Sequence, residues 1–143
     1  MTGIGSPSIS YRLQADAATL RYDQRTISEE LSVSIPDGAF TVIVGPNACG
    51  KSTLLKALSR LIRPSDGQVI LDGHDIHSMG AKDVARRLGL LPQSAIAPDG
   101  IIVADLVARG RYPHQSFLRQ WSRADEATVE KAMAATGVTD LSS

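Results

Sequence analysis

The sequence lacks the features that mark secreted, membrane-spanning and nucleic-acid-binding proteins. It has a single cysteine in 143 residues, so no disulfide can form within the chain. No apolar run approaches the roughly 20 residues of a membrane-spanning helix, and residues 1–10 have no signal-peptide pattern. The 15 Lys and Arg residues balance the 15 Asp and Glu residues, which excludes the broad positive field of a dedicated nucleic-acid binder. We therefore expect a cytoplasmic protein with no nucleic-acid partner.

The chain does have enough apolar sequence for a folded core, because 43% of its residues are hydrophobic. A compact chain of this size buries roughly 68–70% of the surface that its unfolded form exposes. This content also argues against intrinsic disorder. We expect one ordinary folded domain that needs neither disulfides nor a structural metal.

The spacing of apolar residues predicts an α/β fold. Alternation with a period of two predicts strands at residues 8–13, 18–22, 27–35 and 68–71. The continuous apolar run at residues 40–44 predicts a strand buried on both faces, as in a parallel sheet, and residues 88–91 predict another buried strand. Helices are predicted at residues 51–62, 81–87, 102–109 and 122–136, a turn at residues 72–73 and a loop at residues 94–100.

A glycine-rich motif stands between the predicted buried strand and the first predicted helix. Residues 45–52 read G-P-N-A-C-G-K-S and fit the pattern G-x-x-x-x-G-K-[ST] in the structural context that this motif requires. Glycines let the backbone wrap around a phosphate chain, and the following helix presents the positive end of its dipole. Lys51 is expected to contact the β- and γ-phosphates, and the Ser52 hydroxyl is expected to ligate Mg²⁺.

Cys49 lies inside this motif, where a helix N-terminus lowers the pKa of a thiol in some proteins. It occupies a variable position, and no His and Asp partners accompany it in the sequence. We therefore expect no catalytic role for Cys49, although its alkylation would block the loop sterically.

Three segments together resemble the ATP-binding cassette (ABC) ATPases. Residues 45–55 resemble the Walker A segment of that family, in which P-N-x-x-G-K-S-T-L-L is habitual. Tyr22 stands where the family keeps an aromatic residue that stacks on adenine, and Gln93, after Leu-Leu-Pro, resembles the glutamine of the Q-loop. The resemblance implies a P-loop NTPase fold of the ABC type that binds ATP and Mg²⁺. It assigns nucleotide contacts to Tyr22, Gly45, Pro46, Asn47, Ala48, Cys49, Gly50, Lys51, Ser52 and Thr53, metal contacts to Ser52 and Gln93, and coupling to the attacking water to Gln93.

Two further segments narrow the resemblance to one branch of the family. Residues 63–76 resemble the family's P-x-x-G-x-I-x-x-x-G-x-x-I segment, and residues 107–114, V-A-R-G-R-Y-P-H, are similar to the importers of iron(III)-siderophores and vitamin B12. Pro113 is expected to end the preceding helix and to leave Tyr112 and His114 in a surface loop.

The resemblance also implies an organisation and a set of partners. Residues 1–93 would form an ATP-binding core with antiparallel strands, and residues 94–143 would begin a helical subdomain. Residues 93–114 would face a membrane permease from the inner side of the cell membrane. A second ATP-binding subunit would complete a homodimer, and a substrate-binding protein would act indirectly.

The family also hydrolyses ATP with an LSGGQ-type signature, an apolar strand that ends in Asp-Glu and a switch histidine, and this sequence contains none of them. The chain is therefore expected to bind ATP without turning it over alone. Two alternatives stay open: a nucleotide-binding module that never hydrolyses ATP, and a small P-loop kinase that uses Asp72 or Asp105 as its acidic residue. The turn at residues 72–73 is the ordinary explanation for Asp72, and no second carboxylate accompanies Asp105 in its segment.

Overall fold

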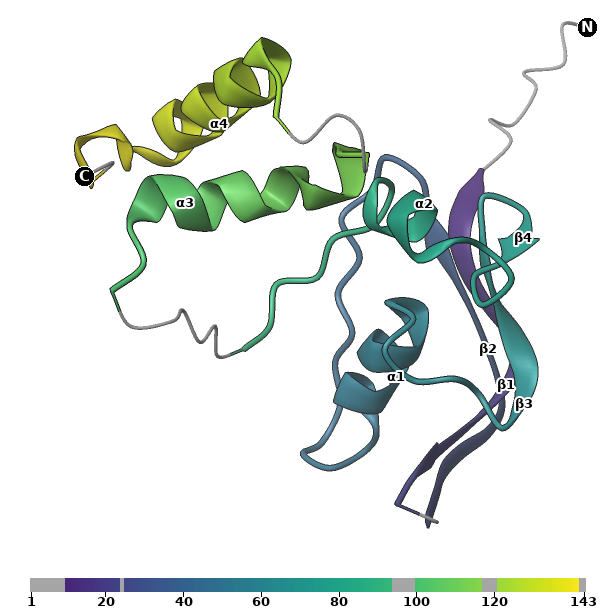
Figure 1. The fold of residues 1–143 in the computed structure, drawn as a ribbon. Coiled ribbons are helices and arrows are strands. Elements are labelled where there is room, and N and C mark those ends of the chain that lie inside the picture. The colour runs from purple at the N-terminus through teal and green to yellow at the C-terminus, as the bar shows by residue number, and fades with distance from the viewer. Residues whose placement is uncertain (1–9, 24, 94–99, 117–120, 142–143) are drawn as a thin grey trace, which may run out of the picture. The chain divides into compact units, whose positions relative to one another are not determined.

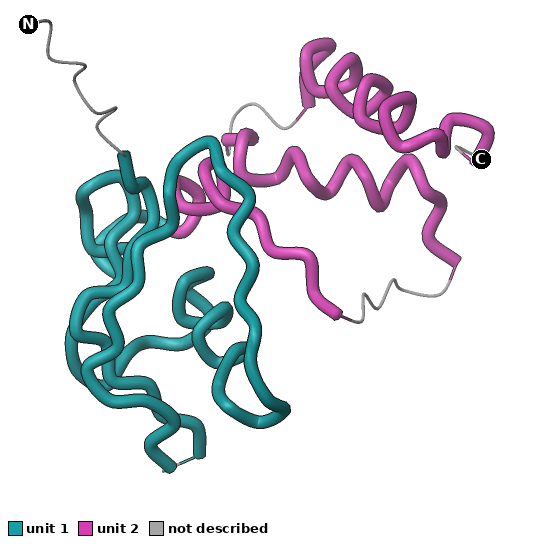
Figure 2. The backbone as a smooth tube through the Cα atoms, turned by 180° about the vertical axis from the view of Figure 1, so that it is seen from behind, with its two compact units in different colours: residues 1–80 teal, residues 81–143 magenta. Residues whose placement is uncertain are grey.

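The computed structural model describes residues 10–23, 25–93, 100–116 and 121–141 (Figure 1). The chain divides into two compact units, Met1–Gly80 (unit 1) and Ala81–Ser143 (unit 2), shown in different colours in Figure 2. The predicted division at residue 93 stays a prediction, as does the loop at residues 94–100, of which residues 94–99 lie outside the described residues.

Unit 1 is built on an antiparallel sheet with the strand order β2-β1-β3-β4. The strands are β1 (Tyr11–Tyr22), β2 (Arg25–Pro36), β3 (Asp66–Leu71) and β4 (His74–Asp75). The central strand β1 pairs with both β2 and β3, so that Ala15 lies opposite Val33 on one side and Val69 on the other. The predicted strands at residues 18–22, 27–35 and 68–71 are confirmed, and β1 also takes in residues 11–13 of the strand predicted at 8–13.

Helix α1 (Lys51–Leu58) packs against β1. Its buried residues Leu54, Ala57 and Leu58 recur at the spacing of one helix face, and each leucine stabilises the unit by about 1.5–3 kcal/mol. The helix ends four residues before the predicted position. Arg60 has a φ of 66° and donates its N–H to the carbonyl of Ala57, which turns the chain out of the helix.

Two glycines of unit 1 occupy positions that a side chain would disturb. A Cβ atom on Gly67 would lie 2.1 Å from the carbonyl oxygen of Ala17 on β1, and Gly67 has a φ of 71°. Gly73 follows Asp72 in the β3–β4 turn, where both residues have positive φ values, as a type I′ hairpin turn requires. The turn predicted at residues 72–73 is therefore confirmed.

The two predicted buried strands are absent. Residues 40–44 and 88–91 have no strand pairing in the part of the chain that the structure describes, and Phe40, Val44 and Leu91 are 95%, 83% and 89% exposed. A β-strand exists only where a neighbouring strand accepts and donates its backbone hydrogen bonds. No described strand lies beside either segment, so their apolar composition alone does not produce a strand.

Unit 2 consists of short helices. They are α2 (Ala81–Ala85), α3 (Val103–Ala108), the 3₁₀ helix η1 (Arg109–His114), α4 (Arg123–Thr136) and the 3₁₀ helix η2 (Thr139–Leu141). Helix α4 packs against α3 and buries Val129 and Met133. The predicted helices at 81–87, 102–109 and 122–136 are confirmed, with ends within two residues of those expected.

Pro113 does not end the preceding helix, contrary to the prediction. Helix α3 ends at Ala108, and Pro113 lies inside η1, which continues to His114. A 3₁₀ helix this short accepts a proline because few of its N–H groups have partners within the helix. Tyr112 and His114 therefore lie in η1 and not in the predicted loop, although both are exposed as expected.

Among the described residues, no helix is both long and apolar enough to cross a membrane.

Candidate nucleotide-binding site

The candidate site begins at residues 45–50, which we call the glycine loop. The loop connects residues 40–44 to the first residue of α1. Gly50 has a φ of 94°, and a Cβ atom there would lie 2.5 Å from Cγ2 of Ile27 on β2. Glycine is thus required at this position both by the backbone conformation and by the approach of β2. A Cβ atom on Gly45 would lie 3.0 Å from the sulfur of Cys49, so there is little space for a side chain at the first residue of the loop as well.

The side chain of Lys51 reaches back into the glycine loop. Its Nζ atom donates to the carbonyl oxygen of Gly45 at 2.8 Å and to that of Pro46, and it lies 3.6 Å from the sulfur of Cys49. The loop therefore places a positive charge among its own carbonyl groups. Cys49 is exposed and reduced, and no catalytic partner is placed beside it in the described residues.

The start of α1 is open to an acceptor from outside. No side chain caps the helix, and its first turn contains no acidic residue. The N–H groups of a first helical turn have no partners within the helix, and the helix dipole gives them a partial positive charge. Together with Lys51, they form the set of donors that binds a phosphate chain. The residues present therefore fit the phosphates of a nucleotide, and the exposed Ser52 offers a hydroxyl oxygen to Mg²⁺.

The backbone conformation of Ala48 is not predicted by the sequence. It has a φ of 62°, in the left-handed region that costs a residue with a side chain about 1–2 kcal/mol. The turn that aims the loop's N–H groups therefore uses left-handed residues at both Ala48 and Gly50. A local sequence pattern does not reveal the strained position, since alanine gives no turn signal.

Tyr22 belongs to the same unit as the glycine loop. It is the last residue of β1 and is 58% exposed. The Nζ atom of Lys56, in the second turn of α1, lies 5.5 Å from the centre of its ring. The structure thus places the predicted adenine-stacking residue beside the helix that follows the loop, with much of its surface open to a ligand.

Gln93 lies in unit 2, whereas the loop and Tyr22 lie in unit 1. It is exposed and follows a segment that is not a strand. The predicted nucleotide contacts at Tyr22 and in the glycine loop thus both lie in unit 1. The nucleotide contacts and the placement of Gln93 at a metal stay predictions.

The acidic residues of the kinase alternative have other surroundings. The Asp72 carboxylate accepts hydrogen bonds from Nε and Nη2 of Arg12 at 2.7 and 3.1 Å, and this pairing raises the pKa of Arg12. Asp72 thus ties the β3–β4 turn to β1 instead of facing the glycine loop. Asp105 lies on α3 and lines a cavity of about 560 Å³ with Glu126 and Glu130 of α4. Within the described ranges, no cluster of three or more acidic, His or Cys residues is arranged to hold a metal ion.

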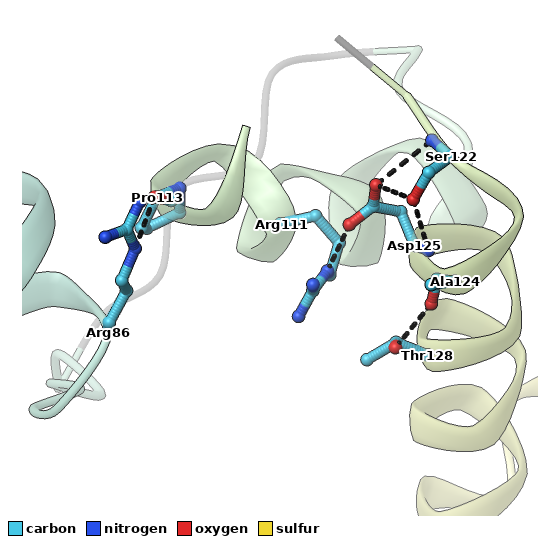
Figure 3. A network of polar contacts seen from close by, with 7 residues as sticks. All are labelled: Arg86, Arg111, Pro113, Ser122, Ala124, Asp125 and Thr128. Carbon is cyan, nitrogen blue, oxygen red and sulfur yellow. Dashed lines mark hydrogen bonds and ion pairs between the residues drawn. The ribbon is translucent and has the colours of Figure 1, made fainter. Parts of the chain in front are cut away.

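Helix η1 lies in the region predicted to face a permease, of which residues 94–99 are outside the described residues. Three cationic side chains hold η1 and the residue after it, and Figure 3 shows two of them, Arg86 and Arg111. Lys82 and Arg86, on and just after α2, donate to the carbonyl oxygens of Gln115 and Pro113 at 2.8 and 2.9 Å. Arg111 of η1 donates to the carboxylate of Asp125 at 2.8 Å. We call these three residues the η1 clamp.

Asp125 also belongs to the cap of α4. Its carboxylate accepts a hydrogen bond from the Ser122 hydroxyl at 2.6 Å, and the two residues form a reciprocal capping box. The hydrogen bonds from Ser122 and Arg111 lower the pKa of Asp125. The sequence shows Ser122 before the helix, but the pairing of Asp125 with Arg111 depends on packing.

Comparisons with known proteins agree on one family. The family model described as "ABC transporter" matches residues 28–143. The chain is 55% identical over 130 residues to the ferric enterobactin transport ATP-binding protein FepC of Escherichia coli K12, and this match covers 91% of the chain and 48% of FepC. It is 41% identical to the iron(3+)-hydroxamate import ATP-binding protein FhuC of Bacillus subtilis, over 90% of the chain and 48% of that relative. The chain therefore spans about half the length of these curated relatives.

Solved structures show the same fold at lower sequence identity. The ATP-binding subunit of an ABC transporter superposes with a TM-score of 0.74 at 18% identity, over 92% of this chain and 53% of that one. An inward-facing metal-chelate type ABC transporter superposes with a TM-score of 0.70 at 23% identity, over 92% and 47%. At this identity the likeness concerns the fold alone. The family model nevertheless matches well over half of the sequence, and the chain belongs to the ABC transporter family, in its ATP-binding domain.

Proposed function

We propose that the chain binds ATP through the glycine loop and the start of α1. The ammonium group of Lys51 is the observation that carries this proposal, since it already lies inside the loop at an uncapped helix start. Its present acceptors are neutral carbonyl groups. A hydrogen bond from an ammonium group to a charged phosphate oxygen is roughly twice as strong as one to a neutral carbonyl oxygen. The β- and γ-phosphates would therefore replace the carbonyl groups as the acceptors of Lys51. Amide groups of the loop and of Ser52 and Thr53 would bind the same phosphates.

Mg²⁺ and the adenine base would be held by side chains other than Lys51. We assign the metal to the Ser52 hydroxyl and to Gln93, which are the oxygen donors that the family pattern supplies here. The ion would neutralise phosphate charge when bound. The exposed ring of Tyr22 would stack on adenine, since it ends the strand next to α1 in the same unit.

At the level of the whole protein, we propose a role in the ATP-driven import of an iron(III)-siderophore or related chelate. The names of the relatives and the identity of 55% with one of them support this assignment. The chain would lie at the inner face of the cell membrane and contact permease subunits through residues 93–114. Within that region, the η1 clamp holds the exposed Tyr112 in place. A second ATP-binding subunit and a substrate-binding protein would complete the system.

The 143-residue chain alone is proposed to bind ATP without turnover. The signature segment, the Asp-Glu strand and the switch histidine, with which the family stabilises and activates the reacting groups, are not in its sequence. Groups that neutralise transition-state charge contribute about 10³–10⁵ in rate to phosphoryl transfer. Binding and hydrolysis should therefore separate in this chain.

Calorimetric titration with Mg-ATP tests the binding site. Lys51→Ala should weaken binding by about 10- to 100-fold, the equivalent of one hydrogen bond to a charged group. Lys131→Ala is the matched control, because Lys131 is an exposed lysine on α4 and its removal changes the net charge equally. Equal affinity of the Lys51→Ala variant and the control would overturn the assignment of the loop.

Two further measurements test the rest of the proposal. Release of inorganic phosphate from Mg-ATP should stay at the background rate, and steady turnover that disappears in Lys51→Ala would overturn the expected lack of activity. The transport role predicts that importer permease genes neighbour the coding region. Neighbours that encode only an exporter's membrane domains would contradict the siderophore assignment.

A further inference from the structure

Helix α1 carries two lysines that reach different parts of unit 1. Lys51, its first residue, reaches into the glycine loop, whereas Lys56 reaches the ring of Tyr22 at the end of β1. Five residues of α-helix span about 7.5 Å. One short helix therefore places one cation at the proposed phosphate site and another at the proposed base site.

The contact between Lys56 and Tyr22 has the geometry of a cation–π interaction. The Nζ atom lies 5.5 Å from the ring centre, within the roughly 6 Å over which an ammonium group is attracted to an aromatic face. Tyr22 is 58% exposed, so the lysine leaves much of the residue open. An exposed tyrosine at a strand end otherwise has considerable rotational freedom, which a cation over its face would restrict.

We infer that Lys56 is a positioning residue for the nucleotide base: it holds the Tyr22 ring in one orientation before adenine stacks on it. This inference rests on the proposed ATP site. Binding to a mobile side chain loses the entropy of ordering it, which corresponds to about 2- to 10-fold in affinity for a side chain of this kind. A ring that Lys56 already orders avoids most of that loss.

Two other effects of Lys56 would give different results. A positive charge near the site also attracts phosphates at long range, which would act on any polyphosphate. Alternatively, the ammonium group would compete with adenine for one ring face, and its removal would then strengthen ATP binding. The experiment must therefore separate the base from the phosphates and measure the sign of the change.

Calorimetric titrations with Mg-ATP and with Mg-tripolyphosphate, which has no base, make this separation. Lys56→Met should weaken ATP binding by about 2- to 10-fold and leave tripolyphosphate binding within about 1.5-fold, because only ATP uses the ring. Lys56→Arg keeps the charge and the cation–π contact, so it should retain the affinity for ATP. Lys131→Met is the matched control: Lys131 is an exposed lysine on α4 in unit 2, so the same charge is removed away from the proposed site.

A double-mutant cycle with Tyr22→Leu completes the test. Once the ring is absent, Lys56→Met should cause no further loss of ATP affinity. An equal loss in the Tyr22→Leu background, an equal loss for tripolyphosphate, or tighter ATP binding in Lys56→Met would each overturn the inference and leave the ATP site intact. If the unsubstituted chain bound neither ligand, the proposed function would fail, and the inference with it.

Discussion

The glycine loop of unit 1 and the η1 helix of unit 2 are both irregular segments whose carbonyl groups accept hydrogen bonds from cationic side chains. In the glycine loop, the donor Lys51 follows its acceptors by five or six residues in the same segment. At η1, the donors Lys82 and Arg86 lie on and just after α2, about 30 residues before their acceptors in the chain. The first arrangement is local and the second connects separate elements.

This difference bears on what each segment is able to do. Release of Lys51 from its carbonyl groups breaks no contact between distant elements, so a phosphate chain would displace them without unfolding unit 1. Release of Lys82 or Arg86 would break a hydrogen bond that joins the α2 segment to η1 or to the residue after it. A local cation is suited to exchange between ligands, whereas a long-range cation is suited to holding an exposed side chain such as Tyr112 in place.

The two units also differ in the interactions that fix the backbone where two elements approach each other closely. Unit 1 relies on glycines where a Cβ atom would meet another element, at Gly50 against the Ile27 side chain of β2 and at Gly67 against the backbone of β1. Unit 2 relies on side-chain hydrogen bonds, in the η1 clamp and in the cap of α4. We therefore expect unit 1 to be sensitive to added atoms and unit 2 to lost polar groups.

The largest effect is expected from Gly67→Ala. The added Cβ atom would meet the carbonyl oxygen of Ala17 at 2.1 Å, and we expect a loss of about 3 kcal/mol or more in the free energy of unfolding. Gly73→Ala is the control: Gly73 has a similar positive φ but no atom within 4 Å of the added Cβ, so it should cost only about 1–2 kcal/mol. Urea unfolding followed by circular dichroism measures both, and equal losses would show that the contact with β1 is unimportant.

An intermediate effect is expected at Asp125, with a defined dependence on pH. Its pKa is lowered in the folded chain, so the stability that it contributes is present above the unfolded pKa of about 3.9 and is lost as the pH falls through the folded value. Asp125→Asn should lower the Tm at pH 7 by roughly 5–10 °C and should flatten the decline on the acid side.

Glu126→Gln is the matched control for this prediction, because Glu126 is the next residue of α4 and is exposed. Its Tm and its acid-side decline should match those of the unsubstituted chain. Fluorescence of Trp121, the single tryptophan, reports unfolding next to Ser122 in unit 2. If Asp125→Asn kept the full acid-side decline, the ion pair with Arg111 would not be its cause.

The smallest effect is expected from Arg86→Ala, which removes the hydrogen bond to the carbonyl of Pro113. An exposed hydrogen bond of this kind is worth about 0.5–1 kcal/mol, so amide hydrogen exchange in η1 should accelerate by about 2- to 5-fold. Asp83→Asn removes the other partner of Arg86, at 3.2 Å, and leaves the bond to Pro113. Exchange in η1 that responded equally to both substitutions would mean that the bond to Pro113 does not hold the segment.

The sequence predicted those parts of the fold that depend on local residues. Lys51 at the start of a helix, the turn at Asp72 and Gly73, and the helix after Ser122 all follow from side chains within a few positions of each other. The motif at residues 45–52 likewise identified the glycine loop. Its glycine at residue 50 and its lysine at residue 51 stand where the loop turns and where α1 begins.

What the sequence could not predict depends on partners far along the chain. The ion pair of Arg12 with Asp72, the contact of Lys56 with Tyr22 and the η1 clamp each join residues from different elements. The prediction of strands at residues 40–44 and 88–91 is wrong for the same reason. An apolar pattern indicates that a segment is suited to a sheet, but it does not indicate that another strand lies beside that segment.

Residues 40–44 also bear on how the 143-residue chain, which spans about half the length of its relatives, behaves in a concentrated solution. Phe-Thr-Val-Ile-Val has no charge and no proline, and all four of its residue types are enriched in β-strands. With its backbone unpaired and Phe40 and Val44 exposed, the segment is a template for strand addition by a second molecule. The zero net charge gives no compensating repulsion between molecules. Self-association should therefore begin at this segment, and a charged residue in place of Val42, itself exposed, would oppose it.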